Sequence, residues 1–306
     1  MADQQPEPNT SGKSCPPEKY DRSLRHQLRS LAMHVVVKPQ SLLPVVFALV
    51  TYAVFVIHFL QEHPGIRISE ASEVLSMSSL AIGLIMGFRT HSSYDRWWEG
   101  RRLWGDLVNR TRNFSVKLCE YAPLNDSDKQ RFAQLLREFS RSLKLHLRDT
   151  RYDFDAGGLE PIEHSSHVPL HVVTMLHRET EKLLDNERIS ETKFWILNDQ
   201  LSGFLDVVGG CERLKSSPVS IWFRVGIWLW LLFYYLILPW LLSPHFGYWS
   251  IPIVLLAVYF GVALETIVEQ LHEPFGCELN DLPLDTITEN IGKSVDQIFG
   301  LGTGPS

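Results

Sequence analysis

The sequence lacks the short motifs on which most enzymes and metal sites are built. It contains four cysteines, Cys15, Cys119, Cys211 and Cys277, without C-x-x-C spacing. A nucleophile elbow, a P-loop, an H-E-x-x-H motif and a G-x-G-x-x-G loop are all absent. The chain thus shows no chemistry of a hydrolase or a nucleotide enzyme, and we expect neither enzyme activity nor a cofactor. We also expect reduced thiols, with no disulfide and no zinc.

Histidine offers one candidate metal site. His164, His167 and His171 have a spacing that could bind a metal ion, but they lie in a predicted polar loop without a cysteine or an acidic cluster beside them. We therefore expect no metal site.

Charge is scarce in four tracts, at 41–60, 72–90, 222–242 and 248–268. Each is close to the ~20 apolar residues that a helix needs to cross a bilayer. The mean hydropathy of −0.04 is an average over these tracts and a polar remainder. The segregation predicts a membrane protein with four transmembrane helices.

Basic residues predict the orientation. Of 29 Lys and Arg, only Arg67 falls in the predicted exterior loops. By the positive-inside tendency, both termini and the large middle region are cytoplasmic, as in a multi-pass protein of the cell (inner) membrane. The polar, Pro-rich residues 1–19 predict a disordered tail rather than a signal peptide, and 300–306 a second tail. The net charge of −6 and an acidic C-terminal stretch make nucleic acid an unsuitable partner.

Between Phe88 and Ile221 the chain looks helical throughout, and no strand-type alternation persists anywhere in the sequence. Residues 20–38 form a predicted amphipathic helix, and 91–215 a predicted cytoplasmic set of helices that reaches Tyr121 and continues over 127–149, 170–184 and 190–214. The predicted buried stripes are Trp97, Gly100, Trp104, Leu107, Thr111 and Phe114; Phe132, Leu136, Phe139, Leu143 and Leu147; and Phe194, Leu197, Leu201, Leu205 and Val208.

The second apolar tract carries two regular patterns. Gly83 and Gly87 stand four apart, in the small-xxx-small pattern that lets membrane helices pack closely. Leu80, Leu84 and Phe88 repeat at the same spacing and so share one helix face. Periodicity alone favours core packing for this ladder, and a face presented to a partner or a central axis is the alternative.

Beyond Phe88 the sequence becomes rich in Arg, Trp and acids. It contains G-F-R at 87–89, S-S-Y-D-R-W-W-E-G-R-R-L-W at 92–104 and V-N-R-T-R at 108–112; near the C-terminus, E-P-F-G at 273–276 precedes N-D-L-P-L-D at 280–285. In order and spacing these motifs resemble the bestrophin family, in its compact prokaryotic form. The matching residues are Arg89, Tyr94, Asp95, Arg96, Trp97, Glu99, Gly100, Arg101, Trp104, Asn109, Arg110, Pro274, Phe275 and Gly276.

The resemblance implies a fold and an activity. It implies an all-α membrane protein in which residues 20–299 form a channel domain, with a cytoplasmic helical bundle and five copies around a central pore. Leu80, Leu84 and Phe88 would form an apolar neck, and Val219 a second, cytoplasmic aperture. The implied function is passive conduction of chloride and other small monovalent anions. The alternatives are a monovalent cation channel of the same fold, or a membrane scaffold or signalling protein that does not conduct alone.

Acidic residues suggest two further expectations. The resemblance also raises calcium, because animal bestrophins bind it at an acidic cluster after the motif that corresponds to 273–276. Here only Glu278 and Asp281 could take that part, against the six to eight oxygens of a calcium site, so we expect no calcium activation and a structural role for this turn. We expect Arg89 and Arg96 to bind nearby acids rather than face a vestibule, Arg102 to pair with Asp106, and Glu265 to have a pairing role rather than relay protons.

Overall fold

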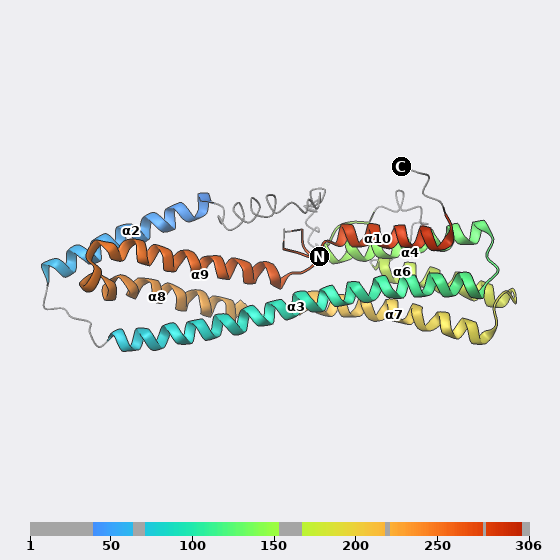
Figure 1. Cartoon of the computed structure of the whole chain (residues 1–306), viewed down its shortest axis with the longest axis horizontal. Helices are drawn as coiled ribbons and strands as arrows, with labels where there is room; N and C mark the ends of the chain where they lie inside the picture. The colour runs from blue at the N-terminus through green and yellow to red at the C-terminus, as the bar shows by residue number, and fades with distance from the viewer. Residues whose placement is uncertain (1–38, 64–70, 153–166, 218–220, 278–279, 302–306) are drawn as a thin grey trace, which may run out of the picture. The chain divides into compact units, whose positions relative to one another are not determined.

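A computed structural model of the chain describes residues 39–63, 71–152, 167–217, 221–277 and 280–301, in which helices are joined by turns and loops (Figure 1). No strand occurs in them, as predicted. The elements are α2 (Pro39–Glu62), α3 (Ala71–Tyr121), α4 (Asp126–Leu147), α6 (Val168–Asp185), α7 (Glu191–Ser216), α8 (Ile221–Phe246), the short 3-10 helix η1 (Gly247–Trp249), α9 (Ser250–His272) and α10 (Leu284–Phe299).

The elements form two compact units. The apolar unit consists, in the described part of the chain, of residues 39–96 and 221–272, and the bundle unit of 97–217 and 273–301. Helix α3 is continuous and contributes its first part to the apolar unit and its remainder to the bundle unit. Its end at Tyr121 agrees with the sequence prediction.

The apolar unit holds α2, the start of α3, α8 and α9, which cover the four predicted spans. Its core joins Met86 to buried residues of α8 and α9. Tyr52 connects α2 to α8 by donating to the carbonyl oxygen of Leu236 and accepting from Nε1 of Trp240, each at 2.8 Å. Pro239 does not end its helix, because α8 continues to Phe246. Within the described ranges, 222–272 is long and apolar enough to cross a membrane, and Val46–Glu62 is a shorter apolar segment.

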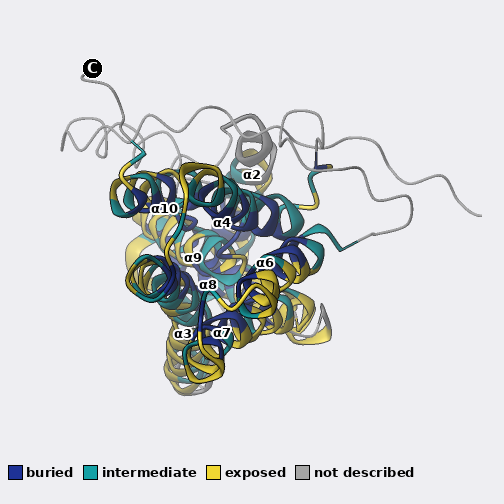
Figure 2. Ribbon diagram, turned by 90° about the vertical axis from the view of Figure 1, so that its right-hand side faces the viewer, coloured by how far each residue is buried: buried dark blue, intermediate teal, exposed yellow. Residues whose placement is uncertain are grey.

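The bundle unit buries the faces that periodicity predicts. The stripe from Trp97 to Phe114 packs in the core, and so does the predicted face of α4. Figure 2 shows buried residues of α4, α6 and α7 on the sides that face one another. A capping box fixes the start of α4: the Asn125 side chain accepts from the backbone N–H of Asp128, whose carboxylate accepts from the N–H of Asn125. One predicted position was wrong, because Leu205 of α7 is exposed and Phe204 is buried in its place.

Helix α10 was not predicted. It buries Leu284, Ile287, Ile291, Val295 and Phe299, a spacing typical of a helix. It ends at Gly300, whose φ of 67° is the left-handed conformation that favours glycine at a helix end.

An ion-pair group connects α10 to α4. The carboxylate of Asp285 accepts hydrogen bonds from Nζ of Lys144 and Nη1 of Arg148, each at 2.7 Å. Burial raises the pKa of Asp285, but these two hydrogen bonds outweigh it and the net pKa is lowered. The ion pair of Arg137 with Asp296 adds a second connection between the same two helices.

The expectation of reduced thiols and no disulfide was wrong. Cys119 and Cys211 are free, but Cys277 is disulfide-bonded. The spacing argument addressed only cysteines that are close in sequence, whereas a disulfide requires only that two Cα atoms come within about 4.4–6.8 Å in space. Burial raises the pKa of the Cys211 thiol to about 12, so this thiol is inert at neutral pH.

Asp285→Asn is expected to lower the melting temperature of the purified protein, by a loss of about 1 kcal/mol, the upper end for a partly exposed ion pair. Because the pKa of Asp285 is lowered on folding, its contribution is complete above the unfolded pKa of about 3.9 and is lost as pH falls further. Thermal unfolding of both proteins at several pH values measures this, and their difference should shrink below about pH 4. Asp149→Asn is the control, because the Asp149 side chain is 82% exposed. An equal effect of both changes would contradict the assignment.

Candidate functional site

The Leu80, Leu84 and Phe88 ladder lies on a face of α3 that is turned away from the core of the apolar unit. The three residues are 77%, 59% and 67% exposed. Met86 on another face is buried against α8 and α9. Core packing within the chain, which periodicity alone favoured, therefore does not explain the ladder. It is a row of apolar side chains without a partner in the described part of the chain.

A hollow of about 740 Å³ lies on a different side of the same helix stretch. Gly83 and Gly87 line it, opposite Tyr234 and Tyr235 of α8 and Gly261 of α9. A methyl group added at either α3 glycine would meet no atom within 4 Å. The two glycines thus open a space here and do not pack against another described helix, unlike the close contact that their spacing predicts.

A buried ion pair joins α3 to α9 at the point where α3 changes character. Nη1 of Arg89 donates to Oε2 of Glu265 at 2.6 Å, and their side chains are only 10% and 2% exposed. The pairing role predicted for Glu265 is confirmed, whereas Arg89 binds an acid 176 residues away in the sequence rather than one of its neighbours. Oε1 of Glu265 is buried without a hydrogen-bond partner among the described residues.

Three signature residues complete this end of the apolar unit. Tyr94 is exposed and lines the hollow. Asp95 lies 3.7 Å from the ring of His91, one turn earlier. Nε of Arg96 donates to the backbone carbonyl oxygen of His272 at 3.3 Å, which connects α3 to the end of α9.

The two signature motifs meet in the bundle unit. Gly100 of α3 faces Pro274, Phe275 and Leu282, which would lie 3.2–3.3 Å from a side-chain carbon at position 100. Nε1 of Trp97 donates to the carbonyl oxygen of Asn280 at 2.9 Å. The absent glycine side chain is what allows this approach. The turn therefore packs directly against α3.

The same turn holds itself closed. The backbone N–H of Leu282 donates to the carbonyl oxygen of Pro274 at 2.9 Å. A methyl group on Gly276 would come within 2.4 Å of Oδ2 of Asp281, so this carboxylate lies directly against the glycine. Asp281 itself is buried.

The remaining signature residues anchor or flank the bundle unit. Trp104 is fully buried, with its Nε1 unpaired among the described residues. Glu99 accepts from Nη2 of Arg213 in α7 at 2.7 Å, and Nε of Arg110 donates to Asp106 at 2.7 Å. The predicted partner of Asp106, Arg102, was therefore wrong, and the pair forms one turn later. Arg101 and Asn109 are exposed.

The proposed aperture residue and one of the three closely spaced histidines lie outside the described residues. Val219 and His164 are not described. His171 does not join His167; instead, His167 lies beside His146 and Glu212. The residues that sequence reasoning missed are Tyr234, Tyr235 and Gly261, and the available signal was the adjacent tyrosines in an otherwise apolar run.

Comparisons with known proteins agree on one family. The model of the family described as bacterial and fungal bestrophin protein matches residues 20–297. A voltage-dependent anion channel-forming protein of Ralstonia nicotianae is 30% identical over 283 residues, which are 88% of this chain and 90% of the relative. One from Synechocystis is 27% identical over 78% of this chain and 80% of the relative. The crystal structure of a bacterial bestrophin homologue from Klebsiella pneumoniae has a TM-score of 0.76 and 26% identity, covering 83% of this chain and 97% of that one.

Gly100→Ala is expected to destabilise the protein by about 1–3 kcal/mol, because a methyl group must displace Phe275 and Leu282 from a packed contact. Gly105→Ala is the matched control on the same helix. No atom lies within 4 Å of its new methyl group, so it should be neutral or stabilise by up to about 1 kcal/mol through helix propensity. Melting temperatures of the two variants should therefore move in opposite directions, and a common rise would show that position 100 has free space.

Glu265→Leu is expected to destabilise by about 3–5 kcal/mol, because it leaves the buried Arg89 guanidinium unpaired. Replacing both partners, with Arg89→Met and Glu265→Leu together, should recover most of that loss. Thermal unfolding of the single and double variants in detergent measures the coupling. Equal losses in the two variants would mean that the pair does not control the stability of this region.

Proposed function

Because this chain belongs to the bacterial and fungal bestrophin family, we propose that it forms an ion channel that passively conducts chloride and other small monovalent anions across a membrane. The relatives from Ralstonia and Synechocystis are named as anion channel-forming proteins, which supports this direction of selectivity. The family is one of channels and not of enzymes.

The proposed assembly has five copies of the chain around a central pore. Residues 20–299 form the channel domain of each copy, with spans at 41–60, 72–90, 222–242 and 248–268, and with tails at 1–19 and 300–306. The helices of 91–215 lie in the cytoplasm together with both termini. The match of the family model over 20–297 supports one continuous domain, and the segregation of basic residues supports the orientation.

The proposed neck rests on the exposure of one row of apolar side chains on α3. Leu80, Leu84 and Phe88 form an exposed apolar row on a helix whose other side packs on its own chain. Copies of such a helix around an axis turn these residues into three stacked apolar rings. A ring of this kind gates by dewetting, because a dry constriction excludes hydrated ions and slight widening admits water.

Val219 is the proposed second aperture, on the cytoplasmic side.

Selectivity for anions in a neck without charged side chains comes from helix N-termini, whose partial positive charge favours anions. Arg89 is not a free positive charge for this purpose, because it binds Glu265.

The first test is the reversal potential of the purified protein in a planar bilayer under a tenfold KCl gradient. A value near the chloride equilibrium potential is the expected result. A value near the potassium equilibrium potential would replace the anion channel with a cation channel of the same fold. Absence of current would favour a scaffold or signalling protein that does not conduct alone.

Leu84→Ala and Phe88→Ala are each expected to raise the single-channel conductance or the open fraction, because smaller side chains widen and wet the neck. Leu256→Ala is the matched control, since Leu256 is 56% exposed but lies on α9. Single-channel recording compares the three variants with the unchanged protein. An equal increase in the Leu256 variant, or unchanged currents in the two α3 variants, would contradict the neck.

A further inference from the structure

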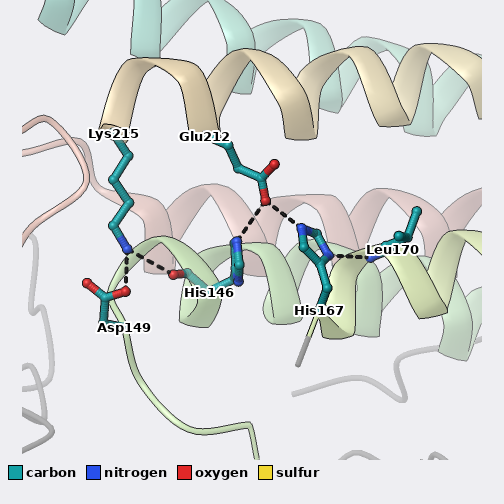
Figure 3. A network of polar contacts seen from close by, with 6 residues as sticks. All are labelled: His146, Asp149, His167, Leu170, Glu212 and Lys215. Carbon is teal, nitrogen blue, oxygen red and sulfur yellow. Dashed lines mark hydrogen bonds and ion pairs between the residues drawn. The ribbon is translucent and has the colours of Figure 1, made fainter. Parts of the chain in front are cut away.

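Three side chains of the bundle unit converge on one point (Figure 3). Oε1 of Glu212 lies 2.8 Å from Nε2 of His146 and 2.5 Å from Nε2 of His167. One potential ligand atom from each residue lies within 4.8 Å of the other two. The imidazole rings lie beside each other, with centroids 4.5 Å apart.

The three residues come from different elements that the core holds in place. His146 is in the last turn of α4, His167 is the N-cap residue of α6, and Glu212 lies on α7. Two of them are next to buried residues of the same core, Leu147 after His146 and Cys211 before Glu212, and His167 precedes Val168, which packs against that core. The three side chains are about one-third exposed, so the point where they meet is open to solvent.

We propose that His146, His167 and Glu212 bind a divalent transition-metal ion of the zinc type. Two imidazole nitrogens and one carboxylate oxygen are a ligand set of zinc sites that keep an open fourth position. Zn–N and Zn–O bonds of about 2.0–2.2 Å place tetrahedral ligand atoms about 3.3 Å apart. The oxygen-to-nitrogen distances here need only lengthen by about half an ångström or slightly more, through side-chain rotation. Calcium and magnesium are excluded as preferred ions, because they favour oxygen ligands.

Neighbouring charges leave Glu212 available. The two basic residues that flank it on α7 are bound elsewhere: Arg213 to Glu99, and Lys215 to Asp149 and the backbone carbonyl oxygen of His146. Figure 3 shows Lys215 directed toward Asp149 and away from the carboxylate of Glu212. Among the described residues, the ion-pair partners of Glu212 are the two histidines.

Binding of the metal ion would break one hydrogen bond, the one from the backbone N–H of Leu170 to His167. Nδ1 of His167 accepts from the backbone N–H of Leu170 at 3.2 Å, so the ring proton is on Nε2, which donates to Glu212. A neutral ring that binds a metal through Nε2 carries its proton on Nδ1, and the Leu170 N–H must then turn to water. Leu170 is exposed, so water reaches it. The ion would connect α4, α6 and α7 at one point, independently of what the pore conducts.

The test uses the full-length, tag-free protein in detergent, stripped of metal with a chelator and titrated with Zn²⁺ alone. Calorimetry should show one high-affinity site per chain, and the melting temperature should rise on binding. Glu212→Gln and His146→Gln should each weaken binding by at least about tenfold, since even outer-shell partners of metal sites contribute roughly 10–100-fold. His171→Ala is the matched control, because this histidine of α6 is outside the cluster, and its affinity should be unchanged.

X-ray absorption at the zinc edge provides a readout that does not depend on how well a variant folds. Scattering from two imidazoles and oxygen is the expected result. Sulfur scattering would place the ion at a cysteine and would overturn the proposal. So would a wild-type protein that binds no Zn²⁺, or an affinity that is lost in the His171 variant and retained in the other two.

Discussion

The buried ion pair between Arg89 and Glu265 lies where α3 changes from an apolar helix to a charged one, and it neutralises the first charge of the second part. Before it, α3 presents apolar side chains and glycines; after it, the helix is rich in Arg, Trp and acids. An unpaired guanidinium this deeply buried is strongly unfavourable, and a partner on α9 makes the position tolerable. One helix can therefore serve an apolar unit and a polar bundle without a break, and the exposed ladder ends one residue before the first buried charge.

The family signature is mainly a packing device. Its two motifs are far apart in sequence, yet Gly100 faces Pro274 and Phe275, and Trp97 donates to the turn that follows them. None of these contacts involves an ion or a substrate. Their effect is to place the start of α10 against α4, where Asp285 binds Lys144 and Arg148. A strongly patterned motif can thus identify a family while its residues hold the helices of the bundle unit together.

Sequence periodicity predicted most of the helices and their buried faces, because burial of an apolar face and helix geometry act over a few neighbouring residues. It failed where a shift of one residue changes which side chain faces the core: on α7, Phe204 is buried in the core and Leu205 is exposed. It also could not find contacts between distant segments. Glu212 is 66 residues from His146 and 45 from His167, so a search limited to closely spaced histidines could not bring these three residues together. The sequence of α10 does carry a helical pattern of apolar residues, at positions 284, 287, 291, 295 and 299. The motif at 273–285 was interpreted only as a turn, and the residues that follow it were not assigned.

The fit between Gly100 and the C-terminal turn has a consequence for how such chains diverge. The side chains of Phe275 and Leu282 occupy the space that a side chain at position 100 would need. A larger residue at position 100 is compatible with the same backbone only if one of the other two becomes smaller. Among related sequences, these positions should therefore covary in size, and a single exchange at any of them should be rarer than a paired one.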